Sequence, residues 1–212
     1  MLSAKFPRSF IDLNRDCEEL DPLLIEDLTV YKDTLKVSAG LGVIPRVVAD
    51  QRPIYNHRLS IDDANERLQG FYFPYHDKLR SLIKQTEVSF KKVILLDCHS
   101  MPLSSVNLAS KKDPVEVVLG DCFGRSCEHE IIVELKTLLT EVGFKVSINN
   151  PFSGGFITKN YASPQNNINV VQIEILRSLY SHEKQQIKNS EFANIQRRLI
   201  DVIEEFIKRF AD

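Results

Sequence analysis

Four aliphatic residues stand in an unbroken row at positions 93–96 of this 212-residue chain. A run of this length is too short to cross a membrane and is typical of a central β-strand that is buried on both faces of a sheet. Apolar residues at helical spacing follow at 128–142, strand-like runs follow at 144–148 and 170–175, and an amphipathic stretch closes the chain at 192–210. Strands that alternate with helices predict an α/β fold, a three-layer sandwich with a mixed, mostly parallel sheet and helices on both faces.

The N-terminal half of the chain carries weaker signals. Apolar runs at residues 9–13 and 43–48 predict two short strands. Ser60 is a typical helix N-cap, with Asp63 as its capping-box partner three positions later, so a helix should begin there. Pro74 lacks an amide proton and clashes with the preceding turn, so we expect it to break or kink that helix before a second helical piece.

Composition narrows the range of partners. The chain has 27 Lys and Arg against 29 Asp and Glu, a net charge of -2, and 43% hydrophobic residues. This balance predicts one globular domain over residues 1–212 and argues against nucleic acid or a membrane as partner. Charged residues interrupt the N-terminal region, so no signal peptide is expected and the predicted location is cytoplasmic. Four cysteines are expected to be reduced thiols: Cys17, Cys98, Cys122 and Cys127.

His99 stands just after the aliphatic run, with Asp97 and Ser100 beside it. Active sites of α/β sheets lie at the carboxyl ends of strands, so this segment is a candidate site. A Ser-His-Asp triad is not expected from these three residues, because neighbouring strand residues point to opposite faces. We also expect Asp97 to lie on the opposite pleat from His99. Two interpretations of His99 stay open: a metal ligand, or a core histidine that bonds to a backbone carbonyl.

Glu174 lies within the alternating run at residues 170–175. Period-two geometry places it on the same face as Gln172. A carboxylate inside such a strand is costly unless it is paired or bound to something. Glu174 is therefore either functional, or a glutamate at the wet rim or in a structural pair with Arg177.

Asn14 and Arg15 follow the first predicted strand. A guanidinium presents a rigid fork that suits a carboxylate, and a neighbouring amide can donate to the same anion. The alternative is an ordinary bridge from Arg15 to Asp12 or Asp16 within the chain.

Several short segments, taken together and in this order, carry a resemblance that runs from about residue 7 to residue 180. The chain resembles the N-formylglutamate amidohydrolase family through SFIDLNR (9–15), GLGVIPR (40–46), PIY (53–55), FPYH (73–76), LLDCHSMP (95–102), LGD (119–121), NPFSGG (150–155) and QIEI (172–175).

This resemblance implies a zinc-carboxypeptidase-like (phosphorylase/hydrolase-like) α/β fold and a metal-dependent hydrolase. The implied reaction converts the small-molecule substrate N-formyl-L-glutamate and water to L-glutamate and formate, late in histidine degradation. By the same resemblance, His99 would be a zinc ligand and Glu174 the general base and acid. Asn14, Arg15 and Arg46 would hold the substrate carboxylates.

The resemblance starts only a few residues after Met1. We therefore expect an N-terminally truncated version of the fold with an incomplete Zn²⁺ site, since a catalytic zinc takes three protein ligands and His99 supplies one. Two alternatives stay open: another zinc amidohydrolase or carboxypeptidase-like enzyme that acts on a different acylated amino acid, and a non-catalytic remnant that binds a carboxylated ligand. An exposed sheet edge would favour a homodimer.

Overall fold

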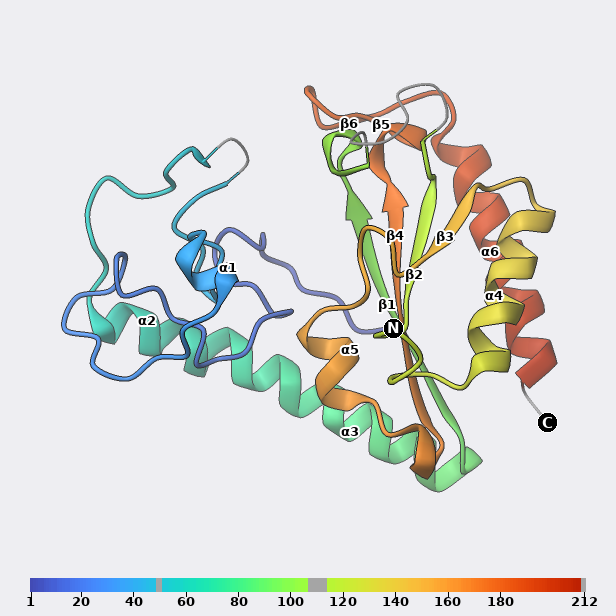
Figure 1. Ribbon diagram of the computed structural model, residues 1–212, viewed down its shortest axis with the longest axis horizontal. Helices are drawn as coiled ribbons and strands as arrows, with labels where there is room; N and C mark the ends of the chain where they lie inside the picture. The colour runs from blue at the N-terminus through green and yellow to red at the C-terminus, as the bar shows by residue number, and fades with distance from the viewer. Residues whose placement is uncertain (49–50, 107–113, 211–212) are drawn as a thin grey trace. The chain divides into compact units, whose positions relative to one another are not determined.

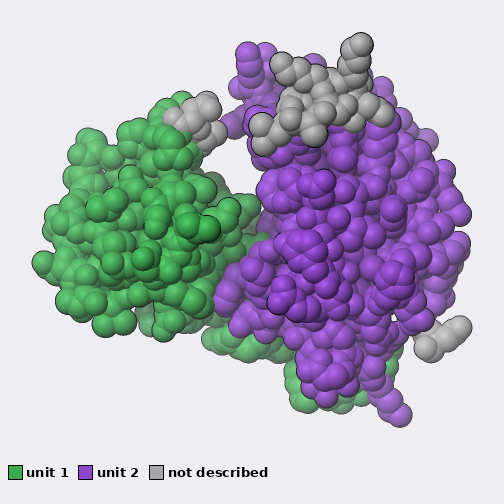
Figure 2. All heavy atoms as spheres, viewed as in Figure 1, with its two compact units in different colours: residues 1–90 green, residues 91–212 purple. Residues whose placement is uncertain are grey.

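The protein is described by a computed structural model that covers residues 1–48, 51–106 and 114–210. It divides into two compact units, Met1–Phe90 and Lys91–Asp212 (Figure 2). The expectation of a single domain for the whole chain stays a prediction. Within the described ranges, no helix is both long enough and apolar enough to cross a membrane.

The second unit is built on a four-stranded sheet (Figure 1). Its strands are β1 (Val93–Met101), β2 (Val117–Gly120), β3 (Val146–Ile148) and β4 (Ile168–Leu176), in the spatial order β1-β4-β2-β3. The pairs β1–β4 and β2–β3 are parallel, and the pair β2–β4 is antiparallel. The predicted mixed, mostly parallel sheet is therefore confirmed.

Helices cover both faces of this sheet (Figure 1). On one face, α4 (His129–Glu141) and α6 (Phe192–Phe210) pack against each other and enclose the main core, and α5 (Phe156–Tyr161) lies on the other. Gly143, with φ +88°, follows α4 where a C-terminal cap was expected. The remaining short elements are the 3₁₀ turns η3 (Leu103–Ser105), η4 (Pro164–Asn166) and η5 (Arg177–Leu179) and the hairpin strands β5 (Ser181–His182) and β6 (Ile187–Lys188).

The aliphatic run at residues 93–96 lies in β1, which is an edge strand in the described part of the chain, because β4 is its one strand neighbour there. The expectation of a central strand buried on both faces is wrong: Ile94, Leu95 and Leu96 are half-buried. An aliphatic run indicates that a strand packs against a core. The run does not indicate how many strands flank that strand. The homodimer that such an edge could support stays a prediction.

The first unit contains one long helical rod. It runs without a break from α2 (Ile61–Arg67) through a π-helical turn, η2 (Leu68–Tyr72), into α3 (Phe73–Phe90), and a one-turn helix α1 (Leu35–Ser38) precedes it. The predicted capping box is confirmed: the Ser60 side chain accepts from the Asp63 amide, and Asp63 accepts from the Ser60 amide.

Of the expected break or kink at Pro74, the break is absent, because the helix continues through this residue. The amide of Phe73 donates to the carbonyl of Leu68, five residues back, so the turn just before Pro74 is wider than an α-turn. A proline cannot donate to the carbonyl four residues before it, and its ring presses on that turn. The π-helical turn relieves this clash and lets the rod continue.

The two strands predicted near the N-terminus are absent from the described structure, where residues 9–13 and 43–48 form turns and irregular segments. A single backbone bond joins them, from the Asp12 amide to the Val43 carbonyl at 2.7 Å. Most of their apolar side chains are buried, with Ile11 at 1% exposure. The prediction of strands is therefore wrong here, and Pro45 has no amide proton with which to extend a ladder.

Candidate active site

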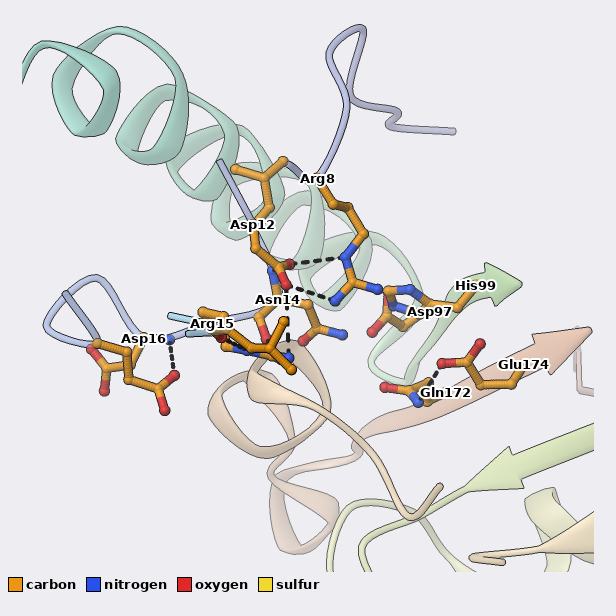
Figure 3. Close-up of polar contacts among 12 residues, drawn as sticks. Arg8, Asp12, Asn14, Arg15, Asp16, Asp97, His99, Gln172 and Glu174 are labelled. Atoms are coloured by element: carbon orange, nitrogen blue, oxygen red, sulfur yellow. Dashed lines mark hydrogen bonds and ion pairs between the residues drawn. The ribbon is translucent and has the colours of Figure 1, made fainter. Parts of the chain in front are cut away.

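A block of four polar side chains lies on one face of the sheet in the second unit. Asp97 and His99 come from β1, and their neighbours in register on β4 are Gln172 and Glu174. Alternate residues of a strand share a face, and registered residues of parallel neighbours share it too. The four side chains therefore project to the same side (Figure 3).

Asp97 and His99 lie within hydrogen-bonding distance of each other, with His99 Nε2 2.9 Å from Asp97 Oδ1. The expectation that Asp97 lies on the opposite pleat is wrong, because two residues of separation return a strand to the same face. Ser100, one residue further on, receives hydrogen bonds from Arg177 at 3.3–3.4 Å. His99 thus pairs with a carboxylate, while Ser100 bonds to Arg177. As expected, the three neighbouring residues do not form a Ser-His-Asp triad.

Glu174 is 8% exposed, so the interpretation as a wet rim glutamate is wrong. Its Oε1 accepts a hydrogen bond from Gln172 Nε2 at 3.2 Å. Val118 of β2 is its neighbour on the other side of β4. A carboxylate in such a setting can take a proton from water and pass it on, provided that substrate reaches it.

Asn14 and Arg15 lie in the first unit, in a turn that Asp12 organises. Asp12 accepts from the Asn14 amide at 3.0 Å and pairs with Arg8 at 2.7 Å, while Arg15 Nη2 is 3.8 Å from it. The Arg15 guanidinium also donates to the carbonyls of Leu41 and Asn14, both at 2.9 Å. The internal bridge from Arg15 to Asp12 is therefore present, and the guanidinium is held in one orientation.

Arg46 makes a different kind of contact. Its Nε lies 2.8 Å from Oδ2 of Asp21, whose side chain is 1% exposed. A buried carboxylate needs such a cation, because an unpaired charge in the interior is costly. This pairing gives Arg46 a structural role, and its predicted contact with substrate stays a prediction.

Two of the segments behind the family resemblance meet beside this block. Gly120, the β2 residue that pairs with Gln172, has no room for a side chain: a Cβ there would lie 2.7 Å from Gly154 N and from the Ser153 carbonyl carbon. The glycine thus lets the loop after β3 lie directly on the sheet. The alternation of β2 residues could have placed Gly120 on this face, had the strand been predicted.

A zinc site does not form from the residues that the structure describes. No three His, Cys, Asp or Glu side chains come together there in a metal-binding group. Burial raises the pKa of the Cys122 and Cys127 thiols, the latter to about 12, so both are protonated at neutral pH. The donor set therefore does not fit a catalytic zinc, which takes three protein ligands.

An apolar groove of about 440 Å³ runs along α6, also in the second unit. Its walls include Ile195, Leu199 and Ile203 of α6 and Ile175 of β4, and His99 also lines it. Such a lining does not suit a doubly charged small molecule, so the groove is not a candidate for the substrate site.

Comparison with known proteins identifies the family. A family model of N-formylglutamate amidohydrolases matches residues 1–181. The chain belongs to the N-formylglutamate amidohydrolase family. The match extends over both units and includes Asn14, Arg15, His99 and Glu174.

Two curated relatives of this family member are named N-formylglutamate deformylase. The one from Pseudomonas putida is 27% identical over 186 residues, which cover 86% of this chain and 64% of the relative. The one from Pseudomonas aeruginosa is 26% identical, with 86% and 65% covered. The chain thus spans slightly less than two thirds of the length of these relatives.

One solved structure supports the same assignment, and a second shows the fold. The crystal structure of N-formylglutamate amidohydrolase from Ralstonia eutropha superimposes with a TM-score of 0.90 at 32% identity, covering 97% of this chain and 76% of that one. A gene product of Agrobacterium tumefaciens shares the fold, with a TM-score of 0.64 at 18% identity.

Proposed function

We propose that this chain catalyses the hydrolysis of N-formyl-L-glutamate to L-glutamate and formate, as a late cytoplasmic step of histidine degradation. The observation that carries the proposal is the family match over residues 1–181. The names of the relatives from two Pseudomonas species and of the Ralstonia enzyme support the choice of substrate.

In this proposal Glu174 is the general base and acid. It takes a proton from the attacking water and delivers it to the leaving nitrogen of the formamide, a role that suits a positioned carboxylate. Its hydrogen bond from Gln172 holds one carboxylate oxygen, so the side chain keeps one orientation on β4. The Asp97–His99 pair on the neighbouring strand lies on the same face.

Asn14 and Arg15 would bind the substrate carboxylates. N-formylglutamate carries two carboxylates and no cationic amine, so it calls for more than one cationic or amide donor, and a guanidinium serves better than an ammonium. The contacts of Arg15 to two backbone carbonyls support this role, because a cation that is already oriented loses little freedom when it binds.

Zinc stays a prediction. The described residues do not form a three-ligand group. His99 would supply one imidazole ligand if a metal binds.

The test is formate release from N-formyl-L-glutamate by the purified chain, compared with N-acetyl-L-glutamate and N-formyl-L-aspartate. Formate from the first substrate in preference to the others supports the proposal. A preference for another acylated amino acid would favour a different amidohydrolase. Metal analysis of the same sample shows whether zinc is present in one-to-one amount.

A second candidate function is that of a non-catalytic protein that binds a carboxylated ligand. The missing three-ligand group among the described residues favours it. It predicts saturable binding of L-glutamate or N-formyl-L-glutamate by calorimetry without any formate release, and an unchanged dissociation constant in Glu174→Gln.

A further inference from the structure

One motif behind the family resemblance, FPYH at residues 73–76, lies on a helix of the first unit and supplies none of the proposed catalytic or carboxylate-binding side chains. It begins α3, directly after the π-helical turn that ends at Tyr72. Tyr72 and His76 are both buried, with His76 at 2% exposure, and their ring centroids lie 4.2 Å apart. Two buried polar side chains on one helix face need a hydrogen-bonding reason.

Both side chains bond to the backbone on either side of Asn14. The Tyr72 hydroxyl donates to the Arg15 carbonyl at 2.8 Å, and His76 Nε2 lies 3.1 Å from the Leu13 carbonyl. These two carbonyls belong to the residues just before and just after Asn14. Side chains of the helical rod therefore bind the turn at two backbone carbonyls, those of Leu13 and Arg15. The candidate carboxylate-binding residues are Asn14, which lies between these two positions, and Arg15 itself.

The chemistry of the His76 contact fixes its protonation. A carbonyl oxygen can only accept, so Nε2 must carry the proton and donate to Leu13. Burial, and to a lesser degree the nearby Arg80, lowers the pKa of His76 to about 4, so the ring is neutral at pH 7. In this tautomer Nε2 serves the Leu13 carbonyl and has no lone pair left for a metal.

The fixed backbone at residues 13–15 also affects the position of the Arg15 guanidinium. Arg15 donates through Nη1 to the Asn14 carbonyl and through Nε to the Leu41 carbonyl. A shift of the backbone at Asn14 would therefore move both the Asn14 amide and one of the anchors of Arg15. Buried donors that fix a turn limit such movement.

We propose that Tyr72 and His76 are positioning residues for carboxylate binding: their hydrogen bonds to the Arg15 and Leu13 carbonyls hold Asn14 and Arg15 in the geometry that receives the substrate. This inference rests on the proposed function, since it takes the Asn14–Arg15 pair as the substrate-binding element. Tyr72 and His76 themselves do not touch the substrate in this proposal.

The test compares three variants and one control variant with the wild-type chain. Tyr72→Phe removes the hydroxyl and keeps the ring, and His76→Leu removes the ring donor. His76→Gln keeps an amide N–H near the position of Nε2 and serves as the conservative rescue. Tyr31→Phe, at a tyrosine that is 41% exposed, is the matched control.

The measurements are KM and kcat for N-formyl-L-glutamate and the calorimetric Kd for L-glutamate. We expect Tyr72→Phe and His76→Leu to raise KM and Kd roughly tenfold, because this change corresponds to the free energy of one lost hydrogen bond. His76→Gln and Tyr31→Phe should stay within about twofold of wild type on the same scale. A purely structural role would lower the folded fraction, and hence kcat, without changing KM or Kd.

The outcomes separate this inference from the proposed function. If the wild-type chain turns over substrate and Tyr72→Phe and His76→Leu, shown to be folded by thermal melting, keep its KM and Kd, the positioning role is overturned and the proposed function stands. If the wild-type chain neither binds L-glutamate nor releases formate, both are overturned. If His76→Leu does not fold, Tyr72→Phe alone decides, because it leaves the packing of the ring intact.

Discussion

Asp97 holds His99 from two residues away on the same strand, with 2.9 Å between Oδ1 and Nε2. The strand period makes this pairing possible, since both side chains emerge from one face of β1. The carboxylate restricts the rotation of the imidazole and presents Nδ1 as the other ring nitrogen. Asp97 therefore sets the orientation in which the His99 ring binds any ligand.

Removal of this partner should impair the reaction more than it impairs binding. Asp97→Asn replaces a charged acceptor by a neutral one, so we expect kcat for N-formyl-L-glutamate to fall roughly tenfold or more while KM changes little. Asp201→Asn, at an exposed position of α6, is the matched control. Steady-state kinetics provide the measurement, and an unchanged kcat in Asp97→Asn would show that His99 needs no orienting group.

Glu174→Gln should separate activity from stability. If Glu174 carries the proton, kcat should fall about 100- to 10,000-fold. The folded state should be at least as stable as wild type, because a buried neutral amide costs less than a buried carboxylate. Formate release and urea unfolding measure the two effects, with Glu141→Gln on the exposed end of α4 as control. A variant with wild-type kcat would remove Glu174 from the mechanism.

Arg46→Met tests whether Arg46 serves the fold or the substrate. Without the guanidinium, the Asp21 carboxylate loses its cation in the interior, so we expect a loss of about 2 kcal/mol in unfolding free energy. The double variant with Asp21→Asn should recover part of this loss, because the buried charge is then gone. A folded Arg46→Met chain with a raised KM would instead support the predicted contact with the substrate.

Substitution by alanine at two glycines should change the free energy of unfolding in opposite directions. At Gly120 the new Cβ would meet backbone atoms 2.7 Å away, so Gly120→Ala should cost about 2 kcal/mol or more and displace the loop after β3. At Gly70 nothing lies within 4 Å, and Gly70→Ala within the helical rod should be neutral or stabilising by up to about 1 kcal/mol. Urea unfolding of both variants checks the contrast, and equal effects would contradict it.

His76 should make stability depend on pH. Its pKa drops from 6.5 to about 4 on folding, chiefly through burial, so between these values the unfolded chain binds a proton that the folded chain does not. The contribution of His76 is complete above pH 6.5 and is lost as the pH falls toward 4. At pH 4.5 the loss amounts to about 2.5 kcal/mol.

The measurement is the unfolding free energy of wild type minus that of His76→Gln, at pH 7.5 and pH 4.5. Other groups titrate equally in both proteins, so this difference isolates His76. We expect it to shrink by about 2.5 kcal/mol at the lower pH. A difference that does not change with pH would mean that His76 keeps its ordinary pKa in the fold.

Much of the second unit could be predicted because its signals are local. The helical spacing in α4 and α6 and the alternation in β4 each lie within one element, so the sequence pattern reports them directly. The position of β1 at the edge could not be predicted, since it depends on which strands come to lie beside it. The predicted strands in the first unit failed because buried apolar residues in turns carry the same pattern as a short strand.

The candidate site divides in the same way. Glu174 and Gln172 were placed on one face by alternation alone, and the same rule, applied to Asp97 and His99, would have predicted their pairing. The contacts of Tyr72 and His76 could not be found in this way, because they join residues 57 and 63 positions apart in the sequence. Such contacts are products of the fold and leave no local period in the sequence.

The wide turn at Leu68–Tyr72 has a consequence for how chains of this type can vary in length. A π-helical turn holds one residue more than an α-turn over nearly the same stretch of helix, so its loss leaves the flanking faces in nearly the same direction. A homologue could therefore lack one residue here and still direct its counterparts of Tyr72 and His76 at the same loop. Such a deletion would have to be accompanied by replacement of Pro74, whose ring a regular turn cannot accept.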